Sequence, residues 1–400
     1  MKNKMFKRIL SLVLVVLMIL TAALATGCGK KDDDDDDDKL DAVERRKDLI
    51  ERLGGASDTY VGSVSEDSYV SAGEAAKAFV TNEVIGSEMA SVSGVKHKKT
   101  LSANEVSSVI PAEVMGEGVV EVQQLEVTYS VMSGENLKAG NGYSKVDTLD
   151  TSRKVDVYVI KYELDWKYFS PCPENDTPLT KSYYDSTFAS ENFKNCTIET
   201  VTKMTMDMKV DGQTQKVDME MTQTMKYADK KILLTQTVTG EAASLGLSNM
   251  NLKAYIEEVD GEMKIYVKMG SDSSWVEGNL YQIGFSSIDE LAPFATSYLE
   301  FTYFVKTDYG FTLRGENAKK YFAEVFESLG SSFDGMLDNM NIDMTADYIV
   351  KDGVLRGATT LADVDFKMEM EGHSVSIKEL VEAETVCYDY GTTVVNRPFN

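Results

Sequence analysis

The sequence has few of the residues on which most catalytic and metal sites depend. Its 400 residues include only two histidines, His97 and His373. Neither histidine has a cysteine, histidine or glutamate neighbour at the spacing of a zinc ligand set, which argues against a metal site. We expect His97 in a loop and His373 in a hairpin connection.

Catalytic and cofactor-binding motifs are also missing. The sequence contains no G-x-S-x-G nucleophile elbow, no phosphate-binding G-x-x-x-x-G-K and no dinucleotide fingerprint. We therefore expect a protein that is not an enzyme and has no cofactor. Because 65 acidic residues supply many carboxylate pairs, a glycosidase that uses two carboxylates stays open as an alternative.

Positive charge is scarce as well. Lys and Arg together number 41 against 65 Asp and Glu, and the net charge is −24. The seven basic residues up to Lys39 balance the seven consecutive aspartates, so the chain after Lys39 carries the whole −24. A surface this acidic argues against nucleic acid as a partner, because phosphates need basic contacts. With only six prolines, we expect no long disordered linker beyond the aspartate run.

What is present at the start of the chain is a targeting pattern. A basic "MKNKMFKR" is followed by the uncharged apolar run Ile9 to Ala25 and by small residues. This order is typical of a secretory signal peptide, which we assign to residues 1–27. The apolar run has the minimum length for crossing a bilayer, so a retained transmembrane anchor is the alternative.

The residues around Cys28 resemble the lipobox of bacterial lipoproteins. The stretch is Ala25-Thr26-Gly27-Cys28, with Leu24 one place before the position where the lipobox usually has leucine. The resemblance implies that Cys28 carries a lipid and becomes the mature N-terminus. We therefore expect a lipid-anchored protein on the extracytoplasmic face of the bacterial cell membrane.

The run Asp32 to Asp38 reads as a spacer behind this anchor. Like charges repel one another and keep the chain extended, and they are repelled by anionic lipid head groups. The run lacks the spaced pattern and the glycine of an EF-hand calcium loop. A short amphipathic helix is expected at Leu40 to Gly55, so residues 28–55 form a lipidated cysteine, a tether and a helix.

Residues 56–185 are predicted to form a small α+β domain of unknown role. A helix begins at Ser71, which together with Glu74 has the spacing of a capping box. Alternating apolar residues from Leu125 to Val131 predict a strand. A second, long strand is expected from Lys154 to Trp166.

Residues 186–400 show a repeated hairpin pattern. Alternating apolar runs turn at Asp211-Gly212, at Asp260-Gly261 and at Asp352-Gly353. Asp-Gly between such runs is a strong signal for a type I′ turn. A helix is predicted at Glu316 to Leu329. The fold class is therefore α+β, with an antiparallel curved sheet and covering helices.

This second half resembles the half-barrel lipoprotein-carrier superfamily, which includes LolA-like carriers and the mycobacterial LppX lipoproteins. The resemblance rests on "SYYDSTFASENFKNCTIETVTKMTMDM", on "MKIYVKMGSDSSWVEG" with Tyr266 upstream of Trp275, and on the closing "VCYDYGTTVVNRPFN". It implies a curved sheet, a half-barrel, that cups an acyl chain or a similar apolar ligand.

The methionines support the same interpretation. Methionine is flexible and polarisable, and so suits a pocket for a ligand of irregular shape. The alternative is that these residues fill a dry core. The expected pocket residues alternate toward one side of their strands and are Met204, Met206, Met208, Met219, Met221, Phe366, Met368 and Met370.

Three cysteines remain after Cys28. A bridge between Cys172 and Cys196 is one possibility, and Cys387 reads as a small buried residue in a strand.

Two function classes follow from these patterns. The first is an anchored lipoprotein that binds or carries a lipid or another apolar ligand. The second is a non-enzymatic structural or interaction lipoprotein of the cell envelope, with a packed interior and a protein partner.

Overall fold

The computed structural model describes residues 37–54, 60–85, 90–131, 152–189, 193–210, 213–240, 251–259, 262–270, 274–279, 301–328, 340–370 and 373–399. The chain divides into two compact units. One contains residues 1–58, 188–299 and 308–400, and the other contains 59–187 and 300–307. The signal-like segment and Cys28 lie outside the described residues.

The smaller unit is built on an antiparallel five-stranded sheet of order β1-β5-β4-β3-β2. Its strands are β1 (Ser63–Val64), β2 (Ala90–Thr100), β3 (Glu121–Val131), β4 (Arg153–Lys161) and β5 (Trp166–Ser170). Its other elements are α3 (Ala72–Phe79), η1 (Val80–Val84), α4 (Ala103–Val109), α5 (Ala112–Met115), α6 (Lys181–Thr187), η6 (Phe301–Tyr303) and β12 (Val305–Thr307).

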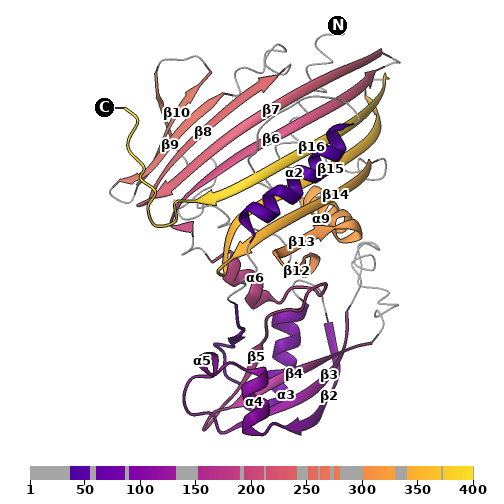
Figure 1. Ribbon diagram of the computed structural model, residues 1–400, viewed down its shortest axis with the longest axis vertical. Coiled ribbons are helices and arrows are strands. Elements are labelled where there is room, and N and C mark those ends of the chain that lie inside the picture. The colour runs from indigo at the N-terminus through magenta and orange to yellow at the C-terminus, as the bar shows by residue number, and fades with distance from the viewer. Residues whose placement is uncertain are drawn as a thin grey trace. The chain divides into compact units, whose positions relative to one another are not determined.

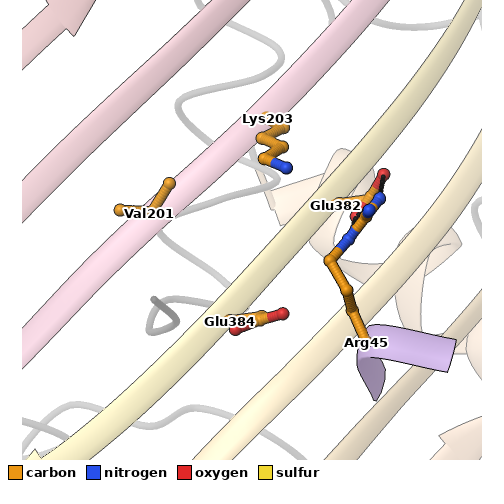
Figure 2. Close-up of a pocket in the computed structure, with 5 residues that line it drawn as sticks. All are labelled: Arg45, Val201, Lys203, Glu382 and Glu384. Atoms are coloured by element: carbon orange, nitrogen blue, oxygen red, sulfur yellow. Dashed lines mark hydrogen bonds and ion pairs between the residues drawn. The ribbon is translucent and has the colours of Figure 1, made fainter. Parts of the chain in front are cut away.

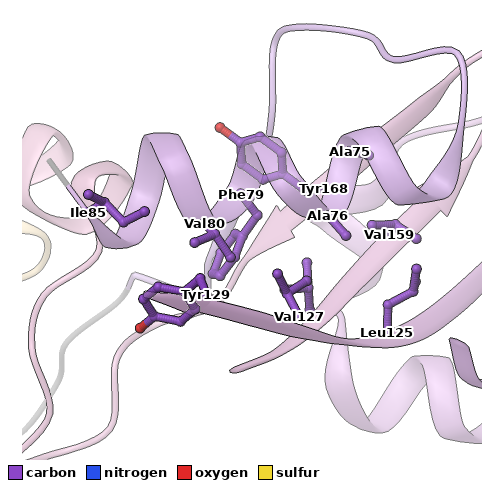
Figure 3. Close-up of a cluster of buried hydrophobic side chains, with 11 residues drawn as sticks. Ala75, Ala76, Phe79, Val80, Ile85, Leu125, Val127, Tyr129, Val159 and Tyr168 are labelled. Atoms are coloured by element: carbon purple, nitrogen blue, oxygen red, sulfur yellow. The ribbon is translucent and has the colours of Figure 1, made fainter. Parts of the chain in front are cut away.

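The core of this unit forms where α3 packs on the sheet. Ser71 accepts a hydrogen bond from the Glu74 backbone N–H, which caps the first turn of α3 and is the Ser71 half of the predicted capping box. The buried face of α3 then meets the inward residues of β3 and β4, as Figure 3 shows. The members labelled there are Ala75, Ala76, Phe79, Val80, Ile85, Leu125, Val127, Tyr129, Val159 and Tyr168.

Two expectations for this unit need correction. The long strand expected from Lys154 to Trp166 is interrupted by a turn in which Tyr162 N–H donates to the Asp165 carbonyl, and Leu164 is 90% exposed there. His97 lies in strand β2 and not in a loop, because "KHKK" pairs along β3.

The larger unit contains one open, curved antiparallel sheet, drawn in Figure 1. Within this unit the strand order is β11-β10-β9-β8-β7-β6-β16-β15-β14-β13. The strands are β6 (Asn195–Val210), β7 (Gln213–Ala228), β8 (Lys231–Gly240), β9 (Leu252–Val259), β10 (Glu262–Met269), β11 (Val276–Asn279), β13 (Gly310–Arg314), β14 (Met340–Lys351), β15 (Val354–Met370) and β16 (His373–Tyr388). The expected α+β class with a curved antiparallel sheet is confirmed.

Of the three predicted Asp-Gly turns, those at 211–212 and 260–261 lie outside the described residues, and the one at Asp352-Gly353 follows the predicted chemistry. Asp352 and Gly353 have φ of 56° and 70°, as a type I′ turn requires. The hairpin between β7 and β8 uses Asp229 and Lys230, also at positive φ. That turn has no glycine, and for this reason the Asp-Gly pattern did not mark it.

Two helices pack on this sheet. Helix α2 (Asp37–Leu53) contacts β14, β15 and β16, and α9 (Gly315–Ser328) contacts β13 and β14. Both helices were expected, although α2 begins three residues earlier than the pattern suggests. No helix among the described segments is both long enough and apolar enough to cross a membrane.

Candidate functional site

The methionines of β6 and β7 lie on one face of the larger sheet. Met204 is directly opposite Met219, and Met206 is opposite Val217. Met208 is on the same side because side chains alternate along a strand. Met221 is opposite Thr202 and joins the same face. We call this side of the sheet the methionine face.

The β15 positions predicted for the pocket fall in the same rows. Phe366 is opposite Ile377, which is in turn opposite Met208. Met368 is opposite Val375, and Met370 is opposite His373. Strand register therefore brings the eight predicted pocket positions, which come from β6, β7 and β15, to one face of the sheet.

The predicted pocket methionines of β6 and β7 are buried. Met204, Met206, Met208, Met219 and Met221 are between 0% and 8% exposed. Val364, Ile377 and Val381 lie in adjoining rows and are also buried. The chain itself thus excludes water from an apolar surface that spans β15, β16, β6 and β7.

One acidic residue is placed within this surface. Glu379 of β16 is opposite Met206 on one side and Val364 on the other. Its side chain is 3% exposed, and its Oε1 has no hydrogen-bond partner in the part of the chain that the structure describes. Burial raises the pKa of Glu379 to about 8, since a carboxylate loses its hydration in apolar surroundings.

Uncharged polar groups form a second feature of the methionine face. The hydroxyls of Thr202 and Thr385 are buried and have no hydrogen-bond partner within the described segments. Thr385 is opposite Thr200, which is opposite Gln223. A row of hydroxyl and amide side chains therefore crosses the sheet beside the methionines.

The opposite face of the same strands is charged and holds α2. Arg45 donates three hydrogen bonds to Glu382 of β16, from Nη2 at 2.9 Å to each carboxylate oxygen and from Nε at 3.2 Å to Oε2. Arg46 forms an ion pair with Asp347 of β14, whose carboxylate is fully buried and also accepts a hydrogen bond from the Tyr309 hydroxyl at 2.6 Å. Leu49 adds a fully buried apolar contact.

A small pocket lies beside this contact, as Figure 2 shows. Its lining consists of Arg45, Val201, Lys203, Glu382 and Glu384. Its internal volume is about 10 Å³, which is room for one water molecule. Burial raises the pKa of Glu384 to about 7, and Arg52 opposes this shift. The pocket is too small for an organic ligand, and we interpret it as a small gap in the packing of α2 against the sheet.

The cysteines depart from one expectation. Cys172, Cys196 and Cys387 form no disulfide bond in the structure, so the bridge considered between Cys172 and Cys196 is not formed. Cys196 is fully buried in β6, and its thiol donates to the Phe193 carbonyl. Burial raises the pKa of Cys196 to about 12, and the unreactive thiol is thereby favoured over the thiolate. Cys387 is buried in β16, as expected.

Among the described residues, no group of three histidine, cysteine, aspartate or glutamate side chains is arranged to hold a metal ion.

Sequence reasoning missed Glu379, although the signal was present. In "SVSIKELVEAETV" the alternating inward positions are Val375, Ile377, Glu379, Val381 and Ala383. A glutamate at an inward position between isoleucine and valine is unexpected in a simple core, and the alternation alone could have identified it.

Comparison with known proteins gives little further guidance. No protein-family model matches the chain, and no curated protein matches it. One similar solved structure is the crystal structure of a DUF1329 family protein from Desulfovibrio piger. It is 10% identical, covers 53% of this chain and 93% of its own, and has a TM-score of 0.17. So low a score does not establish a shared fold, and the resemblance to the half-barrel carriers stays a prediction.

Proposed function

We propose that this protein is a lipid-anchored extracytoplasmic lipoprotein that binds a lipid or another apolar ligand on the methionine face of its curved sheet. The observation that carries the proposal is the gathering of Met204, Met206, Met208, Met219 and Met221 on one face. Valine or isoleucine would suit these strand positions better by β-propensity alone. Methionine side chains adapt to a flexible apolar ligand.

The exposure of the same face near the sheet edge also supports binding. Ile198, Met225, Leu234, Ala254, Val267 and Val276 form one continuous row across β6 to β11. At the far end of the face, Val276 is 66% exposed and Met269 is 54% exposed. The apolar surface thus runs from a buried centre to a solvent-exposed edge, which offers a route for an apolar ligand.

The anchor belongs to the same proposal. Lipidation at Cys28 rests on the Ala-Thr-Gly-Cys sequence alone. Helix α2 begins within the aspartate run and is held on the sheet by Arg45, Arg46 and Leu49. A tether that ends in a firmly held helix would fix the distance between the membrane and the sheet.

The second candidate is an interaction scaffold of the envelope that has a packed interior. This candidate is favoured by the burial of the methionine side chains, because the protein's own residues already cover them. In this case the acidic surface, and not the methionine face, would contact a protein partner.

Native mass spectrometry with organic extraction distinguishes the ligand-binding protein from the interaction scaffold. The test uses a version that begins at Gly29 and so keeps every described residue. We expect a co-purifying lipid that is lost when Met206→Trp and Met219→Trp fill the face. The control is Thr205→Trp, on the opposite face of β6. A protein without bound lipid, whose mass and stability do not respond to added lipid, would contradict ligand binding and leave the scaffold.

A further inference from the structure

On the five central strands of the methionine face, the described side chains include one charged group. On β14, β15, β16, β6 and β7, the described side chains of this face include no Asp, Lys, Arg or His, and Glu379 is the only Glu. Its neighbours along β16 are Ile377 and Val381, and those across the sheet are Met206 and Val364. A ligand on this face would therefore meet one carboxyl group in an apolar surface.

The carboxyl group is also incompletely paired. Glu379 Oε1 is buried and has no hydrogen-bond partner among the described residues. A buried polar atom without a partner destabilises the folded state, and a buried charge without a counter-charge destabilises it more. A packed core would gain stability from an apolar residue here, so the position calls for a partner that the described residues do not supply.

The charge pattern selects the kind of partner. An anionic head group would find no basic side chain among the described residues of this face. The net charge of −24 attracts cations and repels anions at longer range. An ammonium group can donate charge-assisted hydrogen bonds to a carboxylate oxygen, while an attached hydrocarbon chain would contact the methionines.

We propose that the methionine face binds an apolar ligand that carries an amino group, and that the ammonium donates a hydrogen bond to Glu379 Oε1. This inference rests on the function proposed above, because it names the chemistry of the ligand for the same face. Burial of Glu379 in an apolar row provides the selectivity, since only a cationic ligand brings a charge that offsets the cost of the buried carboxylate.

The test compares three probes that share a hydrocarbon chain: dodecylamine, dodecanol and dodecanoate. Isothermal titration calorimetry is run on the version that begins at Gly29, at raised salt to screen non-specific attraction to the acidic surface. We expect dodecylamine to bind about tenfold or more tighter than dodecanol, and dodecanoate to bind most weakly. Glu379→Gln should remove the preference for the amine over the alcohol.

The matched control is Asp207→Asn. Asp207 follows Met206 in β6, is exposed and points to the other face, so this variant removes the same charge away from the ligand. It should keep the preference for the amine. If Glu379→Gln fails to fold, the ratio of amine to alcohol affinity in the unmodified protein decides the inference.

Two results would overturn the inference in different ways. Equal binding of dodecanol and dodecylamine, or equal loss of amine binding in both variants, would reject the role of Glu379 and leave apolar binding in place. Absence of binding for all three probes would reject the proposed function together with the inference.

Discussion

Glu379 and Met206 lie directly opposite each other on adjacent strands, although they are far apart in the sequence. Both side chains are buried, and the methionine presents an apolar neighbour to a carboxyl group that water does not reach. This pair places the only described acidic side chain that β14, β15, β16, β6 and β7 contribute to the methionine face against the residues predicted to contact a ligand.

The first prediction concerns the pH dependence of stability. Burial raises the folded-state pKa of Glu379 to about 8, whereas the ordinary pKa of a glutamate is 4.5. The unfolded chain therefore releases this proton at lower pH, and the folded state loses stability as the pH rises from about 4.5 to about 8. The slope from this one group is at most about 1.4 kcal/mol per pH unit.

Glu379→Gln removes this effect, because glutamine resembles the protonated carboxyl group and does not titrate. We expect the free energy of unfolding of the variant to rise relative to that of the unmodified protein between about pH 5 and about pH 8. This range lies between the unfolded-state and folded-state pKa values of Glu379. Urea unfolding at several pH values measures the difference, and taking the difference between proteins cancels groups such as Glu384. A difference that does not change with pH would contradict the buried, titrating carboxyl.

A second prediction concerns the hold of α2 on the sheet. After Arg46→Ala, the Tyr309 hydroxyl is the only group among the described residues that still donates a hydrogen bond to the buried Asp347 carboxylate. Removing one partner of a buried pair costs about 3–5 kcal/mol, and because Arg46 is partly exposed we expect the lower end of that range. Hydrogen exchange should show faster opening of α2. Lys47→Ala, at an exposed position of the same helix, should leave the exchange unchanged.

A third prediction concerns a buried acid of the smaller unit. Glu83 is 4% exposed and accepts hydrogen bonds from the Tyr168 and Ser170 hydroxyls and from both the backbone N–H and the hydroxyl of Ser182. Glu83→Ala leaves these donors without their acceptor, and we expect a loss of about 2–4 kcal/mol in the free energy of unfolding.

Urea unfolding followed by a probe in the smaller unit, such as Trp166 fluorescence, measures this loss. Glu74→Ala on the exposed side of α3 is the control, and its effect should stay within about 0.5 kcal/mol. Similar stability of both variants would show that the Glu83 network contributes little.

A fourth prediction concerns the anchor. Mass spectrometry of the membrane-extracted protein should find an N-terminal peptide that begins at a diacylglyceryl-modified Cys28. Cys28→Ala should release the protein from the membrane fraction, because a lipid chain is the proposed attachment. An unmodified chain that starts at Met1 would reject lipidation.

Much of the local structure could be predicted from the sequence. Periodicity identified α2, α3 and α9 to within a few residues, since a helix with an apolar stripe is recognisable from spacing alone. The turn at Asp352-Gly353 followed from backbone preference. Alternation also assigned the methionines to one side of their own strands, because successive side chains point to opposite faces.

Tertiary structure decided which strands are neighbours. Pairing of β6 with β16 joins segments that are distant in the sequence, and no local preference specifies such a pairing or its register. A shift of one residue would have placed Lys378 or Leu380, and not Glu379, on the methionine face. The same pairing placed Glu382 beneath Arg45 on the opposite face. The sequence by itself determined the elements and their apolar sides, and only long-range strand pairing determined that a buried carboxyl group lies among the methionines.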